Sequence, residues 1–139
     1  MPPTTVTRSG RALKMLGQAA PGAATDVTLY APSSRFAGII TLIVVCNTGA
    51  ATTFRIHHDN TGATRAVGNA LYYDENINAS GAMAAGATET EYARSGTRRL
   101  FFTNGFEGGL NVRNPGAVSV RSASGACTFT AYGFEEQIL

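Results

Sequence analysis

The residues with the clearest chemical potential are His57, His58 and Asp59, because imidazole and carboxylate side chains bind metal ions and transfer protons. Along an extended strand, His57 and Asp59 would lie on the same face and could contact one ion. Zinc sites normally use three or four such ligands, whereas the chain has 2 His, 2 Cys and no Cys-x-x-Cys pair. The ligand count favours polar residues at a strand end over a metal site.

The stretch Asp59-Asn60-Thr61-Gly62 is similar to the start of a calcium-binding loop, in which a bidentate acid follows the first oxygen ligands. Ala70 and Leu71 occupy the positions where that acid would stand, so we interpret the stretch as a turn. The chain also has no Gly-x-Ser-x-Gly motif and no Gly-x4-Gly-Lys motif. Glycines in residues 105–109 lack the strand–loop–helix setting of a dinucleotide site.

Two pairs of carboxylates, Glu89 with Glu91 and Glu135 with Glu136, have the residue type that glycosidases use as acid and base. That chemistry needs a sugar-binding cleft rich in aromatic side chains, and the chain has no Trp and is 9% aromatic. Its consecutive aromatic residues are Tyr72, Tyr73, Phe101 and Phe102. They are expected to divide between core and interface. The sequence predicts no catalytic residues, no cofactor-binding residues and no metal ligands, and therefore no enzyme.

Length and composition indicate one domain whose surface is poor in charge. A chain of 139 residues can build one hydrophobic core without disulfides or metals. Charged residues make up 14% of the chain, against about 25% on average, so we expect other subunits to cover part of its surface. A net charge of +2 predicts no nucleic-acid binding. The longest apolar run, residues 39–46, is too short to span a membrane.

Residues 1–24 are predicted to form an extended N-terminal basic arm. The first 20 residues contain three basic residues and no acid, which leaves eight basic against nine acidic residues in the rest of the chain. A helical turn capped by Ser9 would be marginal because Gly10 and Gly17 bracket it closely. We expect the arm to bind a partner subunit, with basic residues meeting acidic groups and apolar residues adding contact area. The predicted contact residues are Arg8, Arg11, Leu13, Lys14, Met15 and Leu16.

Residues 25–139 are predicted to form a single β-sandwich or jelly-roll-like domain, so the fold class is all-β. Short apolar runs with period-two alternation recur about every ten residues between turn signals. Strands are expected from residue 26 to Pro32 and at residues 38–47, 52–58, 70–74, 99–103, 110–112, 117–121 and 126–134. A long excursion at 76–97 could include an edge strand at 88–92.

Residues 38–47 are apolar at both odd and even positions, which predicts a strand buried on both faces. The turn at 48–51 predicts that this strand forms a hairpin with residues 52–58. An apolar second face also predicts self-association, because one sandwich core covers only one face.

Cys46 and Cys127 lie in apolar, strand-like runs, where reduced cysteine behaves as a small buried hydrophobe. We expect two free, buried thiols on facing or neighbouring strands. Residues 1–20 lack the continuous apolar segment of a secretory signal, so folding in a cytoplasm is expected.

Five segments carry a family resemblance: LGQAAP at 16–21, LIVVCN at 42–47, ATTFR at 51–55, LYYD at 71–74 and FTAYGFE at 129–135. Together they resemble small virion structural proteins of tailed bacteriophages, over residues 16–136. The resemblance implies a β-sandwich located in the virion and synthesised in the host cytoplasm. It further implies a capsid decoration, or cement, protein that binds the major capsid protein or another virion subunit, often as a trimer.

Other functions remain open at this stage. A tail, neck or baseplate component would have the same fold. A carbohydrate-binding or receptor-binding module would need exposed aromatic residues over a cleft, and an enzyme would need a third ligand near His57.

Overall fold

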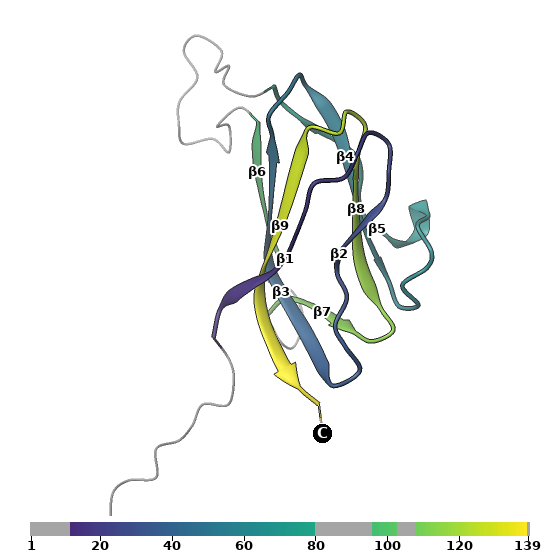
Figure 1. Cartoon of the computed structure of the whole chain (residues 1–139), viewed down its shortest axis with the longest axis vertical. Helices are drawn as coiled ribbons and strands as arrows, with labels where there is room; N and C mark the ends of the chain where they lie inside the picture. Colours follow the sequence, from purple (N-terminus) through teal and green to yellow (C-terminus); the bar gives the residue numbers. More distant parts are fainter. Residues whose placement is uncertain (1–11, 80–95, 103–107, 139) are drawn as a thin grey trace, which may run out of the picture.

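The computed structural model describes residues 12–79, 96–102 and 108–138. These residues form two antiparallel β-sheets that pack face to face (Figure 1), and this confirms the predicted all-β sandwich. The predicted edge strand at 88–92 and most of the excursion at 76–97 lie outside the described residues, as do Arg8 and Arg11.

The first sheet has the strand order β1–β9–β3–β6, and β7 also pairs with β3. Its strands are β1 (Lys14–Ala19), β9 (Cys127–Gln137), β3 (Phe36–Asn47), β6 (Thr97–Phe101) and β7 (Leu110–Arg113). The central strand, β3, pairs along its length with β9 on one side, and with β6 and β7 on the other.

The second sheet has the order β2–β8–β4–β5. Its strands are β2 (Val27–Tyr30), β8 (Ala117–Ser122), β4 (Thr52–Asp59) and β5 (Ala70–Ile77), with a short 3-10 turn, η1 (Val67–Asn69), before β5. Within the described residues no helix is long and apolar enough to cross a bilayer.

The predicted hairpin between residues 38–47 and 52–58 is wrong, because β3 and β4 belong to different sheets (Figure 1). The link between them crosses from one sheet to the other. Asn47 is buried at the end of β3 and fixes this crossing, since its amide donates to the carbonyl oxygens of Ala50 and Asn78 and its side-chain oxygen accepts from the Gly49 amide. The backbone of β3 is paired with β9 and β6 instead of with β4.

The core lies between the two sheets and draws side chains from both. Phe54 of β4 and Phe129 of β9 meet at its centre, with ring centroids 6.0 Å apart in an edge-on arrangement. Ile40, Ile43 and Val45 of β3 pack around them. Each buried aliphatic or aromatic side chain of this size contributes about 1.5–3 kcal/mol through apolar burial.

The cysteine prediction is correct for Cys127 and wrong for Cys46. Both thiols are free and lie on neighbouring strands, but Cys46 is exposed. A register shift between Ile40 and Leu42 turns both Ile40 and Ile43 towards the core and places Leu42, Val44 and Cys46 on the outer face, which is only partly covered. The strict alternation assumed from the sequence therefore fails there, and Cys46 lies on the outer face. The prediction that β3 is buried on both faces therefore fails at Leu42 and Val44, which are partly exposed.

The predicted boundary at residue 24 is also wrong, because the second part of the predicted arm is strand β1 of the first sheet. It pairs with β9 from Lys14 opposite Gly133 to Ala19 opposite Phe129. Gly17 also allows β1 to pass close to β2 of the second sheet, since a Cβ atom there would collide with the backbone carbonyl oxygen of Leu29. The sandwich thus begins at Lys14 rather than at residue 25.

Candidate interaction surfaces

The outer face of the first sheet carries apolar side chains in one row across four strands. Met15 of β1 is in register with Tyr132 of β9, Tyr132 with Leu42 of β3, and Leu42 with Phe101 of β6. Residues in register on neighbouring strands project from the same face. We call these residues the apolar row. Its two ends are strongly exposed, with 55% of Met15 and 64% of Phe101 accessible to solvent.

The apolar row has a polar border on one side and an apolar extension at the start of β1. The bordering register is Gln18, Thr130, Val44 and Arg99, which is polar except at Val44. The Gln18 amide donates to the Thr130 hydroxyl over 3.0 Å. Leu13 precedes β1 and is 63% exposed. Near the far end, a pocket of about 360 Å³ is lined by Tyr72, Arg98, Arg99, Leu100 and Phe101.

Of the six residues predicted to bind a partner, the structure describes four. Leu13 and Met15 are exposed and free to make intermolecular contacts. The Lys14 ammonium instead lies 3.1 Å from Glu135 on β9, and Leu16 packs partly against the core. Arg8 and Arg11 lie outside the described residues. The sequence had pointed to Phe101 only as one of several aromatic residues, and the contribution of Leu42 and Tyr132 required the strand register.

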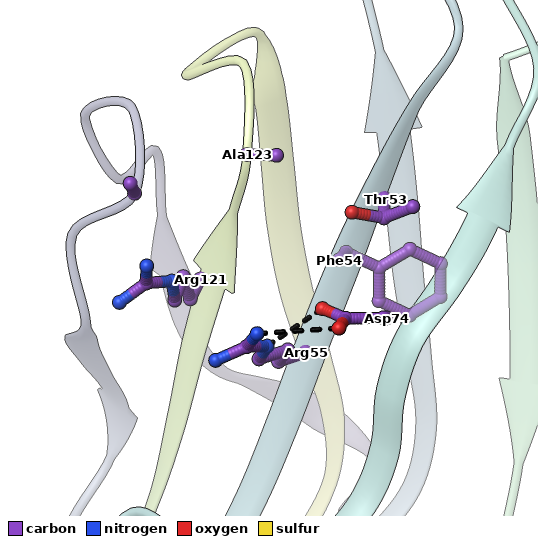
Figure 2. A pocket seen from close by; sticks show the side chains of 7 residues that line it. Thr53, Phe54, Arg55, Asp74, Arg121 and Ala123 are labelled. Carbon is purple, nitrogen blue, oxygen red and sulfur yellow. Dashed lines mark hydrogen bonds and ion pairs between the residues drawn. The ribbon is translucent and has the colours of Figure 1, made fainter.

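A second group of side chains forms a charged row on the outer face of the other sheet: Asp26, Arg121, Arg55 and Asp74. Figure 2 shows the last three of them. Arg55 and Arg121 are register partners on β4 and β8, so two like charges are direct neighbours. This placement is destabilising unless opposite charges compensate it. Asp26 lies beside Arg121 and Asp74 lies beside Arg55. The order of charges along the row is therefore negative, positive, positive, negative.

The two ion pairs of the charged row differ in quality. Asp74 accepts two hydrogen bonds from Arg55, from Nε over 2.7 Å and from NH2 over 3.2 Å. The Arg55 guanidinium also stacks 4.1 Å from the centre of the Tyr73 ring. These hydrogen bonds lower the pKa of Asp74 and raise that of Arg55. By contrast, Arg121 NH1 is 3.5 Å from Asp26 Oδ2.

A small pocket of about 70 Å³ lies beside the two arginines. Its lining comprises Ala24, Thr53, Phe54, Arg55, Asp74, Arg121 and Ala123. Figure 2 shows β4 and β8 side by side, with Arg55 extending from β4 towards β8. No sequence motif marked this pocket, because Arg55 and Arg121 are far apart in the chain and meet only through strand pairing.

His57 and Asp59 do not form a common site. His57 is 2% exposed, and its ring meets Tyr73 edge-on with centroids 6.2 Å apart. Neither ring nitrogen has a hydrogen-bond partner among the described residues, and burial lowers the pKa of this imidazole. The Asp59 carboxylate instead accepts hydrogen bonds from Thr61 Oγ1 and from the Ala63 amide, over 2.7 and 2.6 Å.

These hydrogen bonds hold the pKa of Asp59 below its usual range and make it the organiser of a turn, as the sequence predicted. Across the described ranges, no group of three or more His, Cys, Asp and Glu residues could hold a metal ion.

Comparison of the chain with protein-family models, with curated proteins and with solved structures finds no match. The two surfaces described above are therefore the features from which a function can be inferred.

Proposed function

We propose that this protein is a virion structural protein of a tailed bacteriophage that attaches to its neighbours through the apolar row. Its function would be capsid decoration, in which it binds the major capsid protein or another virion subunit and stabilises the shell. The observation that carries this proposal is the row Met15–Tyr132–Leu42–Phe101, which crosses the outer face of the first sheet and is strongly exposed at both ends.

The chemistry of the apolar row fits a protein–protein interface. Fully buried interface centres are rich in aromatic residues and Met and poor in charge, with polar residues around them. Met15, Tyr132 and Phe101 belong to these favoured types, and the polar border of Gln18 and Thr130 lies beside them. A flat sheet face can present such a surface without any rearrangement.

The position of β1 links the apolar row to the predicted arm. Leu13 and Met15 lie where the chain enters the first sheet, directly after residues 1–11, which contain Arg8 and Arg11. We propose that these two arginines bind acidic groups of the same partner. Each exposed ion pair contributes only about 0.2–1 kcal/mol, so the apolar row would supply most of the affinity.

Trimer formation through the same sheet, and a position in the tail, neck or baseplate, are alternatives within this proposal. A carbohydrate-binding function has weaker support. Tyr73 is exposed on the second sheet, but Arg55 stacks on its ring at 4.1 Å, where a sugar would have to stack.

The test replaces Phe101 with Glu and measures incorporation of the protein into purified phage particles. We expect occupancy to fall at least tenfold, because a buried unpaired carboxylate would replace an aromatic contact. Val67→Glu is the matched control, since Val67 is equally exposed but lies in η1, outside the apolar row.

Full occupancy of the Phe101→Glu variant would overturn the role of the apolar row. A protein that is absent from purified particles in its natural form would overturn the virion assignment itself. A deletion of residues 2–11 tests the arm separately, and we expect reduced incorporation with little change in the free energy of unfolding. The reason is that this stretch contains few large apolar residues.

A further inference from the structure

Arg121 is the less satisfied of the two guanidiniums in the charged row. Its distance of 3.5 Å from Asp26 Oδ2 exceeds the usual range of an N–H···O hydrogen bond. Asp26 Oδ1 is buried and has no hydrogen-bond partner among the described residues. The ion pair is therefore loosely made, and Arg121 keeps N–H donors that its own carboxylate does not use.

The small pocket collects donors from three side chains. Arg55, Arg121 and Thr53 all line it. In Figure 2, Arg55 directs two nitrogens at Asp74 and the third towards β8, the strand that carries Arg121. The same view shows the Thr53 hydroxyl on the side of β4 that faces β8. Ala24 and Ala123 complete the lining with side chains too short to fill the space.

The size and charge of the pocket define the group that it fits. A volume of about 70 Å³ admits a group of a few heavy atoms. The fork of N–H donors on a guanidinium matches the two oxygens of a carboxylate. Asp74 lines the same pocket and Asp26 lies beside Arg121, so a second negative charge on the ligand would be repelled. A carboxylate, with one charge, therefore fits better than a phosphate dianion.

We propose that Arg121, Arg55 and Thr53 form a binding site for a single carboxylate group of a partner polypeptide, an Asp or Glu side chain or a chain terminus. The bound carboxylate would accept the N–H donors of Arg121 that the Asp26 contact leaves unused. This site lies on the sheet opposite the one that carries the apolar row. It is thus a second, independent contact, and it does not depend on the proposed virion function.

The experiment is a titration of the full-length protein, labelled with nitrogen-15, with the peptide acetyl-Gly-Glu-Gly-amide, observed through the arginine Nε–H signals. We expect saturable shifts of the Arg121 and Arg55 signals, with a dissociation constant in the millimolar range. Acetyl-Gly-Gln-Gly-amide, which has the same shape without the charge, is expected to bind at least tenfold more weakly. Inorganic phosphate is the third ligand and distinguishes a carboxylate site from a general anion site.

Three variants complete the experiment. Arg121→Gln is expected to abolish the saturable shifts, whereas Arg113→Gln, on the exposed side of β7, is expected to leave them unchanged. Because loss of Arg121 also affects Asp26, Thr53→Val provides a variant that leaves the Asp26 ion pair in place and removes one donor. We expect it to weaken binding several-fold while the melting temperature changes little.

Three results would overturn the proposal. The first is equal binding of the Glu and Gln peptides. The second is tighter binding of phosphate than of the Glu peptide. The third is unchanged binding by both the Arg121→Gln and the Thr53→Val variants.

Discussion

His57 shows how burial changes the behaviour of one residue. Its imidazole is buried beside Tyr73 and has no hydrogen-bond partner among the described residues. Arg55, Arg65 and Arg121 all disfavour a positive charge there. The carboxylate of Asp26 favours the charge but does not outweigh burial, so the pKa of His57 is lowered from 6.5. Burial also lowers the pKa of His58, on the opposite face of β4, and the charge of Asp59 opposes this shift.

These shifts predict that the protein loses stability in mild acid. The unfolded chain binds a proton on His57 near pH 6.5, whereas the folded protein resists it until a lower pH. The stabilising contribution is therefore present above the unfolded pKa and is lost as the pH falls from there towards the folded pKa. Urea unfolding between about pH 7.5 and about pH 5 should show a decreasing free energy of unfolding.

The His57→Phe variant checks the assignment of this pH dependence. We expect the free energy of unfolding of this variant to decrease less with falling pH than that of the natural protein. The decrease that remains would be due to His58. An identical pH dependence in the two proteins would show that His57 is not the titrating group.

Among the elements, β1 depends most on a single backbone position. Gly17 lies where β1 passes β2, with the carbonyl oxygen of Leu29 in the space of a Cβ atom. Gly17→Val should therefore displace β1 from β9 and lower the free energy of unfolding by about 1–3 kcal/mol. Amide hydrogen exchange should show lost protection in β1 and retained protection in β3. Gly68→Ala is the control, because no atom lies near the added methyl group.

If the β1 amides of the Gly17→Val variant remain fully protected from hydrogen exchange, the substitution does not displace β1 from β9. If β1 is displaced as expected, Met15 moves with it, and incorporation into particles should fall together with β1 protection.

At the scale of the whole molecule, the two cysteines report on which sheet face is covered. Cys46 is exposed on the outer face that carries the apolar row, whereas Cys127 is buried and its pKa is raised by desolvation. A thiol reagent should modify Cys46 rapidly and Cys127 only on unfolding. If the first sheet is the assembly surface, Cys46 should become protected in assembled particles.

Mass spectrometry of labelled particles provides the measurement, and free protein in the same buffer is the control. Equal labelling of Cys46 in free and assembled protein would mean that the outer face of the first sheet stays open to solvent.

The sequence by itself was sufficient for the fold class and for most of the strands. Alternation of apolar and polar residues is a local property, and it located β2, β3, β4, β8 and β9 with small errors at their ends. It also identified Cys127 as a buried residue of β9, because no bulge interrupts the pairing of that part of the strand with β3. The turn at Asp59 was predictable for the same reason, since its hydrogen bonds join neighbours in the chain.

Only the tertiary structure decided which strands are neighbours and which face each residue occupies. The link from β3 to β4 has a turn composition whether it closes a hairpin or crosses between sheets, and long-range pairing with β9 determined the outcome. The bulge near Thr41 places Cys46 on the outer face of the first sheet. Residues Lys14–Ala19 form a strand because they pair with β9. The apolar row and the Arg55–Arg121 pair depend on register between segments distant in the chain. Side-chain alternation disfavours a one-residue slip of register but does not select the partner strand, because the same pattern can pair with many strands.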